Sequence, residues 1–237
     1  MKSLFKIFFG IASAVIFSSC TLYQHVKLEG NIPLTKKSEF LLENDSMRII
    51  YSFNGQSGPI HLTIFNKSDK PFYVDWEKSA LIMNGESFSL WKDVARLSGT
   101  ASGYQINPTN ETTISSNSFE GSIVKKDKVT FIPPQAKILV NSYTLYSKLL
   151  DTPSQTGELM KVKTLEGKRE ATKFSFSKEN SPLTFRIYIS FSADENLKTT
   201  FHIDNTFWVS DYFTCYTSPQ VWSTYQGNLF YNWFSNY

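Results

Sequence analysis

Apolar and polar residues alternate along several segments of this chain. Across residues 185–192 the odd positions hold Phe or Ile, and the even positions hold Arg, Tyr or Ser. Successive side chains of a β-strand point to opposite faces, so a period of two predicts half-buried strands. The other segments with this character are 47–53, 60–64, 137–146, 173–177 and 199–203. No segment carries a long apolar stripe at helical spacing, so the pattern predicts an all-β protein.

Turn-forming residues lie between the predicted strands. Asn84-Gly85 separates 80–83 from 87–90, and this pair closes a two-residue hairpin well because both residues accept positive φ. We expect Asp204-Asn205 to close a second hairpin between the apolar segments on either side of it. Short strands that recur every 8 to 12 residues or so, with polar turns between them, predict an antiparallel β-sandwich.

Two polar stretches bear on the domain organisation. Residues 98–122 are rich in Ser, Thr, Asn and Gly, which predicts a long loop or excursion, and residues 152–172 are the one candidate internal boundary. The strands after this boundary read as the missing half of a sheet, so we expect a single domain. In this interpretation residues 20–45 are a tether and first strand, and residues 46–237 are the sandwich with an aromatic C-terminal tail.

One part of the chain resembles a known group of proteins. After the apolar segment 60–65 come Asn66, a turn to Pro71, the motif Asp75-Trp76-x-x-Ser79 and the Asn84-Gly85 hairpin. This order is similar to that of uncharacterised lipoproteins from Bacteroidota-type bacteria. Val129–Pro134 also resembles the proline-marked strand start of immunoglobulin-like bacterial domains. The resemblance implies an immunoglobulin-like β-sandwich and no particular activity, because a fold alone does not supply function.

The first 19 residues have the character of a secretory signal. Lys2 and Lys6 supply positive charge, and an apolar run of 11 residues follows at 7–17. At about 1.5 Å per residue, a helix of this length cannot cross a hydrocarbon core of about 30 Å. The sequence therefore predicts a cleaved signal peptide over 1–19 rather than a membrane span.

The segment Phe17-Ser18-Ser19-Cys20 resembles the lipobox of bacterial lipoproteins, with Phe17 in place of the usual Leu. The resemblance implies cleavage before Cys20 and a lipid on its thiol, and two or more acyl chains hold a protein firmly at a membrane. Neither an Asp nor an acidic cluster follows Cys20. By the rules of such lipoproteins, this favours an outer-membrane anchor with the domain facing the periplasm.

The charge and the cysteine content limit which binding partners and which disulfide bonds the sequence predicts. Loss of residues 1–19 removes Lys2 and Lys6, so 24 basic residues become 22 against 21 acidic ones, and the net charge falls from +3 to +1. A nearly neutral chain gives no electrostatic reason to bind nucleic acid. If Cys20 is acylated, Cys215 has no disulfide partner, and its aromatic surroundings predict a buried, inert thiol.

Candidate catalytic and metal-binding groups are sparse. Asp75 and Glu77 lie two apart on a predicted strand, which places both on one face, where paired carboxylates can bind Ca²⁺ or assist glycoside hydrolysis. A solvated strand face is the alternative. The three histidines, His25, His61 and His202, form no metal-binding pair, and no nucleophile elbow or phosphate-binding loop is present. We therefore predict no metal and no cofactor.

The C-terminal tail, 221–237, is aromatic and uncharged. It either folds back on the sandwich or docks on a partner protein or a membrane interface, where Trp and Tyr are favoured. In the docking alternative Trp222, Phe230, Trp233 and Phe234 are the anchors.

Three functional hypotheses remain open at this point. The first is a non-enzymatic envelope lipoprotein whose tethered sandwich binds or scaffolds another envelope component. The second is a glycan-binding module in which exposed aromatic residues such as Trp91 and Tyr104 stack on sugars. The third is a carboxylate-dependent hydrolase, which requires at least two of four carboxylates to share a cleft, namely Asp75, Glu77, Asp93 and Asp211.

Overall fold

The computed structural model describes residues 21–91, 93–94, 99–106, 112–119, 124–125, 127–146, 148–151, 153–154, 156–165, 167–218 and 225–235. Over these residues the regular secondary structure consists of β-strands, and the protein is an all-β sandwich, as the sequence predicts. None of the described segments forms a helix long and apolar enough to cross a membrane. Cys20 lies outside the described residues.

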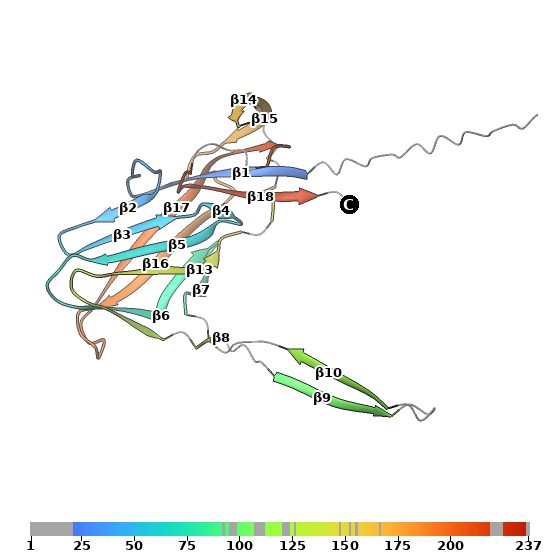
Figure 1. Ribbon diagram of the computed structural model, residues 1–237. Helices are drawn as coiled ribbons and strands as arrows, with labels where there is room; N and C mark the ends of the chain where they lie inside the picture. The colour runs from blue at the N-terminus through green and yellow to red at the C-terminus, as the bar shows by residue number, and fades with distance from the viewer. Residues whose placement is uncertain are drawn as a thin grey trace, which may run out of the picture.

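The larger of the two sheets has ten strands, and its main path runs β12-β6-β16-β17-β1-β18-β4 (Figure 1). Strand β7 pairs with β6, β15 pairs with β17, and β14 pairs with β15. All pairs are antiparallel except β18 with β4. The bounds are β1 Thr21–Gly30, β4 Gly55–Gln56, β6 Phe72–Met83, β7 Glu86–Ser89, β12 Val129–Ile132, β14 Glu158–Thr164, β15 Gly167–Ser175, β16 Thr184–Ser192, β17 Thr200–Cys215 and β18 Leu229–Ser235.

The smaller sheet has four antiparallel strands in the order β13-β5-β3-β2 and packs against one face of the larger sheet. Its strands are β2 Phe40–Glu43, β3 Met47–Ser52, β5 Pro59–Asn66 and β13 Lys137–Thr144. Two short strand pairs complete the description: β8 Asp93–Val94 with β11 Val124–Lys125, and β9 Gly99–Ile106 with β10 Thr112–Phe119. The sequence predicted a long loop or excursion over residues 98–122, and in the structure β9 and β10 pair there as two antiparallel strands.

The core between the sheets is built by the alternating apolar positions of the strands. Phe207, on β17, lies at its aromatic centre, with ring centroids of four other residues within 4.9 to 5.3 Å. These neighbours are Phe40, Tyr51, Phe53 and Phe185. Rings that meet edge-on or tilted gain quadrupole attraction in addition to apolar burial, so this cluster ties the two sheets together.

Several predicted elements are confirmed. Strands β3, β5 and β16 coincide with the alternating segments, and their apolar positions are buried. Asn84 and Gly85 both have positive φ, 51° and 81°, and close the β6–β7 hairpin. The immunoglobulin-like strand order stays a prediction.

The predicted hairpin at Asp204-Asn205 is wrong, because β17 runs unbroken through both residues. Asp204 pairs across the sheet with Tyr188 and forms an ion pair with Arg186. The buried Asn205 side chain donates a hydrogen bond of 2.7 Å to the hydroxyl of Tyr51 in the opposite sheet. Two residues with high turn propensity are thus held in a strand by partners far away in the sequence.

The first and last described strands lie side by side in the larger sheet, and β1 is flanked by β17 and β18 (Figure 1). Thr21, the residue after Cys20, already pairs with Ser235 of β18. A paired strand therefore occupies residues 21–30, where the sequence suggested that a short tether begins. The described part of the tail folds back on the sandwich, because β18 is part of this sheet.

Candidate functional site

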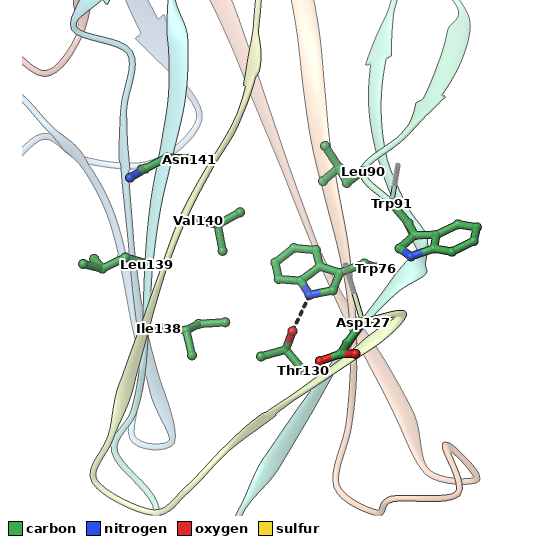
Figure 2. A pocket seen from close by; sticks show the side chains of 9 residues that line it. All are labelled: Trp76, Leu90, Trp91, Asp127, Thr130, Ile138, Leu139, Val140 and Asn141. Carbon is green, nitrogen blue, oxygen red and sulfur yellow. Dashed lines mark hydrogen bonds between the residues drawn. The ribbon is translucent and has the colours of Figure 1, made fainter. Parts of the chain in front are cut away.

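A cavity of about 570 Å³ opens between the two sheets at the edge formed by β6 and β12 on one side and β13 on the other (Figure 2). We call it the side cavity. Its size falls within the range of small-ligand sites, about 300–1,000 Å³. The lining combines two indoles and several aliphatic side chains with a carboxylate and a hydroxyl. The lining residues are Trp76, Leu90, Trp91, Asp127, Thr130, Ile138, Leu139, Val140 and Asn141.

A bulge in β6 shapes the wall of the cavity. On β16, Ser190 pairs with Asp75, but the residue two places earlier pairs with Ala80, so β6 carries extra residues at this point. Bulges re-aim side chains locally. The Ser79 hydroxyl fixes the bulge by donating to the Asp75 carbonyl oxygen at 2.6 Å and accepting from the Ser190 N–H at 3.0 Å. The motif Asp75-Trp76-x-x-Ser79 is therefore the sequence of this bulge.

Trp76 is held firmly within the bulge. Its indole N–H donates to the Thr130 hydroxyl at 2.8 Å, and its backbone N–H donates to the Lys128 carbonyl oxygen at 2.8 Å. The side chain is almost fully buried. A buried indole N–H needs an acceptor, so Thr130 is the residue that allows a Trp to form this wall.

Trp91 lies on the side of the cavity away from β13 and is partly exposed (Figure 2). The Lys128 ammonium lies 4.9 Å from the centroid of the Trp91 ring and 3.0 Å from a carboxylate oxygen of Glu77. A cation over an indole face is attracted by the ring quadrupole. This rim therefore combines an aromatic surface with an exposed ion pair.

The opposite wall comes from β13, whose side chains alternate. Ile138 and Val140 point toward Trp76, whereas Leu139 and Asn141 point to the other face of the smaller sheet (Figure 2). The amide oxygen of Asn141 accepts a hydrogen bond of 2.8 Å from Nδ1 of His61 on that face. The β13 wall is thus apolar, and the polar groups of the cavity come from β12 and the residues just before it.

The described lining residues suit binding by stacking, apolar contact and a few hydrogen bonds. Among them Asp127 is the single carboxylate, and neither His nor Cys is included. Over the part of the chain that the structure describes, no three His, Cys, Asp or Glu side chains lie close enough to hold a metal ion.

The described carboxylates of the hydrolase hypothesis do not share a cleft. Asp75 is buried with Lys78 at 3.5 Å, while Glu77 points out to Lys128. Asp75 pairs with Ser190 on β16, and Ser190 pairs in turn with His202 on β17. His202 and Asp211 are nine residues apart on β17. Nine residues of strand span about 30 Å, which separates these carboxylates. The side chain of Asp93 lies outside the described residues.

Asp75 and Glu77 do not share a strand face either, although the period of two predicted it. Asp75 is buried and Glu77 is exposed. The extra residues of the bulge interrupt the alternation between them. The sequence does not reveal this, because a bulge is defined by the pairing of β6 with β16.

Cys215 and His25 occupy a second, smaller apolar cluster on the other face of the larger sheet, formed by Val162, Ala171, Phe213 and Cys215. The thiol is buried, as predicted, and burial raises its pKa. The His25 ring stacks on Phe213, with centroids 4.8 Å apart and planes 8° apart. Burial lowers the pKa of His25 to about 4, and the nearby Thr217 backbone partly opposes this effect.

The proposed docking residues of the tail lie in different environments. Phe230 is fully buried in the main core, where it cannot contact a partner. Trp233 and Phe234 are 45% and 53% exposed. Trp222 lies outside the described residues, as do Cys20 and the side chain of Tyr104. The two exposed docking candidates that the structure describes, Trp233 and Phe234, therefore lie at the end of the tail, next to the start of β1.

Sequence reasoning singled out Trp91 but missed the residues that complete the cavity. Thr130, Ile138 and Val140 lie far from Trp76 in the sequence, and only the pairing of β12 with β6 and the packing of the sheets bring them together. The proline-marked segment 129–134 was the one local signal near Thr130.

Comparison with models of protein families, with curated proteins and with solved structures finds no match for this chain.

Proposed function

We propose that this protein is a non-enzymatic lipoprotein of the bacterial cell envelope, whose β-sandwich binds or scaffolds another envelope component. Lipid on Cys20 anchors it in the outer membrane, with the domain facing the periplasm. The side cavity is the binding site. The observation that carries the binding role is the cavity itself, because its size and aromatic lining suit a bound group.

The lipid anchor is supported by the lipobox-like sequence Phe17–Cys20 at the end of a short apolar run. Thr21 starts a strand in the interior of the larger sheet, so the lipidated residue adjoins the folded domain directly. An anchor without a long tether holds the sandwich close to the membrane and fixes which end of it faces outward. Such an arrangement suits a protein that presents a binding site at a set height above the bilayer.

A glycan is the second candidate ligand, and Trp91 favours it. The indole is partly exposed at the rim of the cavity, and Asp127 and Thr130 lie in the same lining. Sugars present apolar C–H faces and hydroxyl edges, which fit an aromatic face beside hydrogen-bonding groups. The Lys128 ammonium over the ring would then compete with the sugar for the same aromatic surface.

Site-specific photocrosslinking in intact membranes tests the binding role. A photoreactive phenylalanine analogue replaces Asp127, which is exposed in the cavity lining, and in a matched control it replaces Leu159, which is exposed on β14. We expect one defined protein product from position 127 and none from position 159.

A second measurement separates the glycan alternative. Purified wild type and Trp91→Ala are tested for binding to solubilised envelope glycans. Binding by wild type that is lost in the variant favours the glycan-binding module. If position 127 gives no product and no glycan binds, the side cavity is not a binding site and the proposal is wrong.

A further inference from the structure

We propose that the end of the sandwich at which β1 begins is inserted in the headgroup layer of the lipid bilayer. We call this the anchor end and define it by Thr21–Tyr23, Tyr216 and Trp233–Phe234. This inference rests on the lipid anchor proposed above. It adds an orientation of the domain and a second contact with the membrane, made by protein side chains.

Strand pairing brings the exposed aromatic residues of the anchor end together. Tyr23 pairs with Cys215 on one side and with Trp233 on the other, and Leu22 pairs with Phe234. Tyr216 directly follows Cys215. At about 3.4 Å per residue, Trp233 and Phe234 lie within roughly 7 Å of the level of Thr21 along the strands. Figure 1 shows the start of β1 and the end of β18 at the same end of the larger sheet.

Three aromatic side chains at this end are well exposed. Tyr216 is 70% exposed, Phe234 53% and Trp233 45%. Exposed large apolar groups concentrated in one place mark an interaction surface. A site with both Trp and Tyr at its surface matches the preference of these residues for the membrane–water interface, where the ring is apolar and its polar edge stays hydrated.

The chain segments that form this surface carry no charged side chain. No Asp, Glu, Lys or Arg occurs between Tyr212 and Tyr237, although such residues make up 19% of the chain. The three residues of β1 at this end, Thr21–Tyr23, are uncharged as well. A charged side chain pays a large desolvation cost near hydrocarbon, so these uncharged segments are the ones that a bilayer accepts, rather than the neighbouring strand β15 with its exposed residues Lys168–Glu170.

Covalent geometry decides between a bilayer and a protein as the occupant. Consecutive Cα atoms lie 3.8 Å apart, so a lipidated Cys20 holds Thr21 within a few ångströms of the headgroups. Because Thr21 is already paired in the sheet, the neighbouring ends of β17 and β18 must lie at nearly the same height. A partner protein therefore has no room between this end and the membrane.

Fluorescence quenching by brominated lipids tests the orientation. The lipidated full-length product is reconstituted in phosphatidylethanolamine and phosphatidylglycerol vesicles, with and without bromine on the acyl chains near the headgroup. Wild type is compared with Trp233→Phe, so that the difference in emission isolates Trp233. Trp208→Phe is the matched control, since Trp208 pairs with Glu29 near the other end of β1. Intact mass of the vesicle-bound protein reports its acylation.

We expect the Trp233 emission to fall by about half in brominated vesicles, because interfacial side chains are buried about 5–10 Å into the headgroup boundary. The Trp208 emission should be unchanged. If the acylated protein is bound to the vesicles and Trp233 is not quenched, the orientation is wrong while the lipid anchor stands. A chain without acyl mass that does not bind the vesicles overturns the anchor and the orientation with it.

Discussion

The anchor end and the side cavity both expose aromatic side chains, but the groups around those side chains differ. At the anchor end, Tyr216, Trp233 and Phe234 lie in a part of the chain without charged residues. At the side cavity, Trp91 lies beneath the Lys128 ammonium, and Asp127 belongs to the same lining.

This difference indicates that exposed aromatic residues alone do not identify a partner. A charged group beside an aromatic ring loses its hydration when the ring enters lipid, which costs free energy. Such a surface therefore suits a polar ligand and opposes insertion into a bilayer. An uncharged aromatic surface has no such cost at a bilayer interface.

Phe230→Ala and Trp233→Ala separate the buried part of the tail from its exposed end. Phe230 fills the main core, so its truncation should lower the free energy of unfolding by about 3–5 kcal/mol. Trp233 is nearly half exposed, and its truncation should cost about 1 kcal/mol or less. Urea unfolding of both variants without the lipid measures the two values. Equal losses would contradict the assignment of Trp233 to a surface that is free in solution.

Acid should lower the free energy of unfolding because of His25, which lies on β1 two residues after Tyr23 of the anchor end. Its pKa falls from 6.5 in the unfolded chain to about 4 in the folded protein, because burial disfavours the charged ring. The unfolded state therefore binds more protons between these values, and this part of the stability is full above pH 6.5 and is lost as the pH falls toward 4. The full shift corresponds to about 3 kcal/mol.

His25→Phe is the variant that tests this assignment, because Phe can keep the stacking on Phe213 without titrating. Unfolding free energies at pH 7 and pH 4.5 are compared for wild type and variant. We expect the decline over this window to be clearly smaller in the variant. The same decline in both proteins would show that another group is responsible.

Thr130→Val tests how the wall of the side cavity is held. The substitution removes the acceptor of the buried Trp76 indole N–H, and an unsatisfied buried donor costs about 1–3 kcal/mol. Thr130→Ser keeps the hydroxyl and serves as the matched control. Thermal unfolding should show a lower midpoint for Val than for Ser, and the reverse order would argue against the role of this hydrogen bond.

Lys128→Ala should have the smallest effect on stability. Its ion pair with Glu77 is about half exposed at both partners, and exposed pairs contribute less than about 1 kcal/mol. The loss of unfolding free energy caused by Lys128→Ala should be smaller still at high salt, because salt screens the ion pair. Unfolding in low and high salt measures it. A large loss of unfolding free energy that does not depend on salt would mean that Lys128 stabilises the fold by more than its ion pair with Glu77.

Sequence patterns predicted the strands well wherever a strand has one buried face. The period of two gave β3, β5 and β16, and turn chemistry gave the Asn84-Gly85 hairpin. The same rules failed at Asp204-Asn205. Asn205 is bonded to Tyr51, which is 154 residues away, and such a long-range partner leaves no mark in the local sequence.

The candidate sites show the same contrast between features visible in the local sequence and features that depend on long-range contacts. Trp91, Cys215 and the aromatic tail were visible in the sequence as residues with unusual surroundings. The cavity was not, because it depends on the bulge at Asp75–Ser79 and on the packing of β13 against β6 and β12. The anchor end emerges only when pairing places Tyr216 and Trp233 beside Tyr23.

The intact mass of the protein from bacterial membranes tests the proposed lipid on Cys20, on which both the anchor and its orientation depend. Wild type is compared with Cys20→Ala. We predict that wild type lacks residues 1–19, carries acyl mass on Cys20 and sediments with the outer membrane, whereas the variant carries no acyl mass. Wild type that is soluble and free of acyl mass would show that the proposed lipid anchor is wrong.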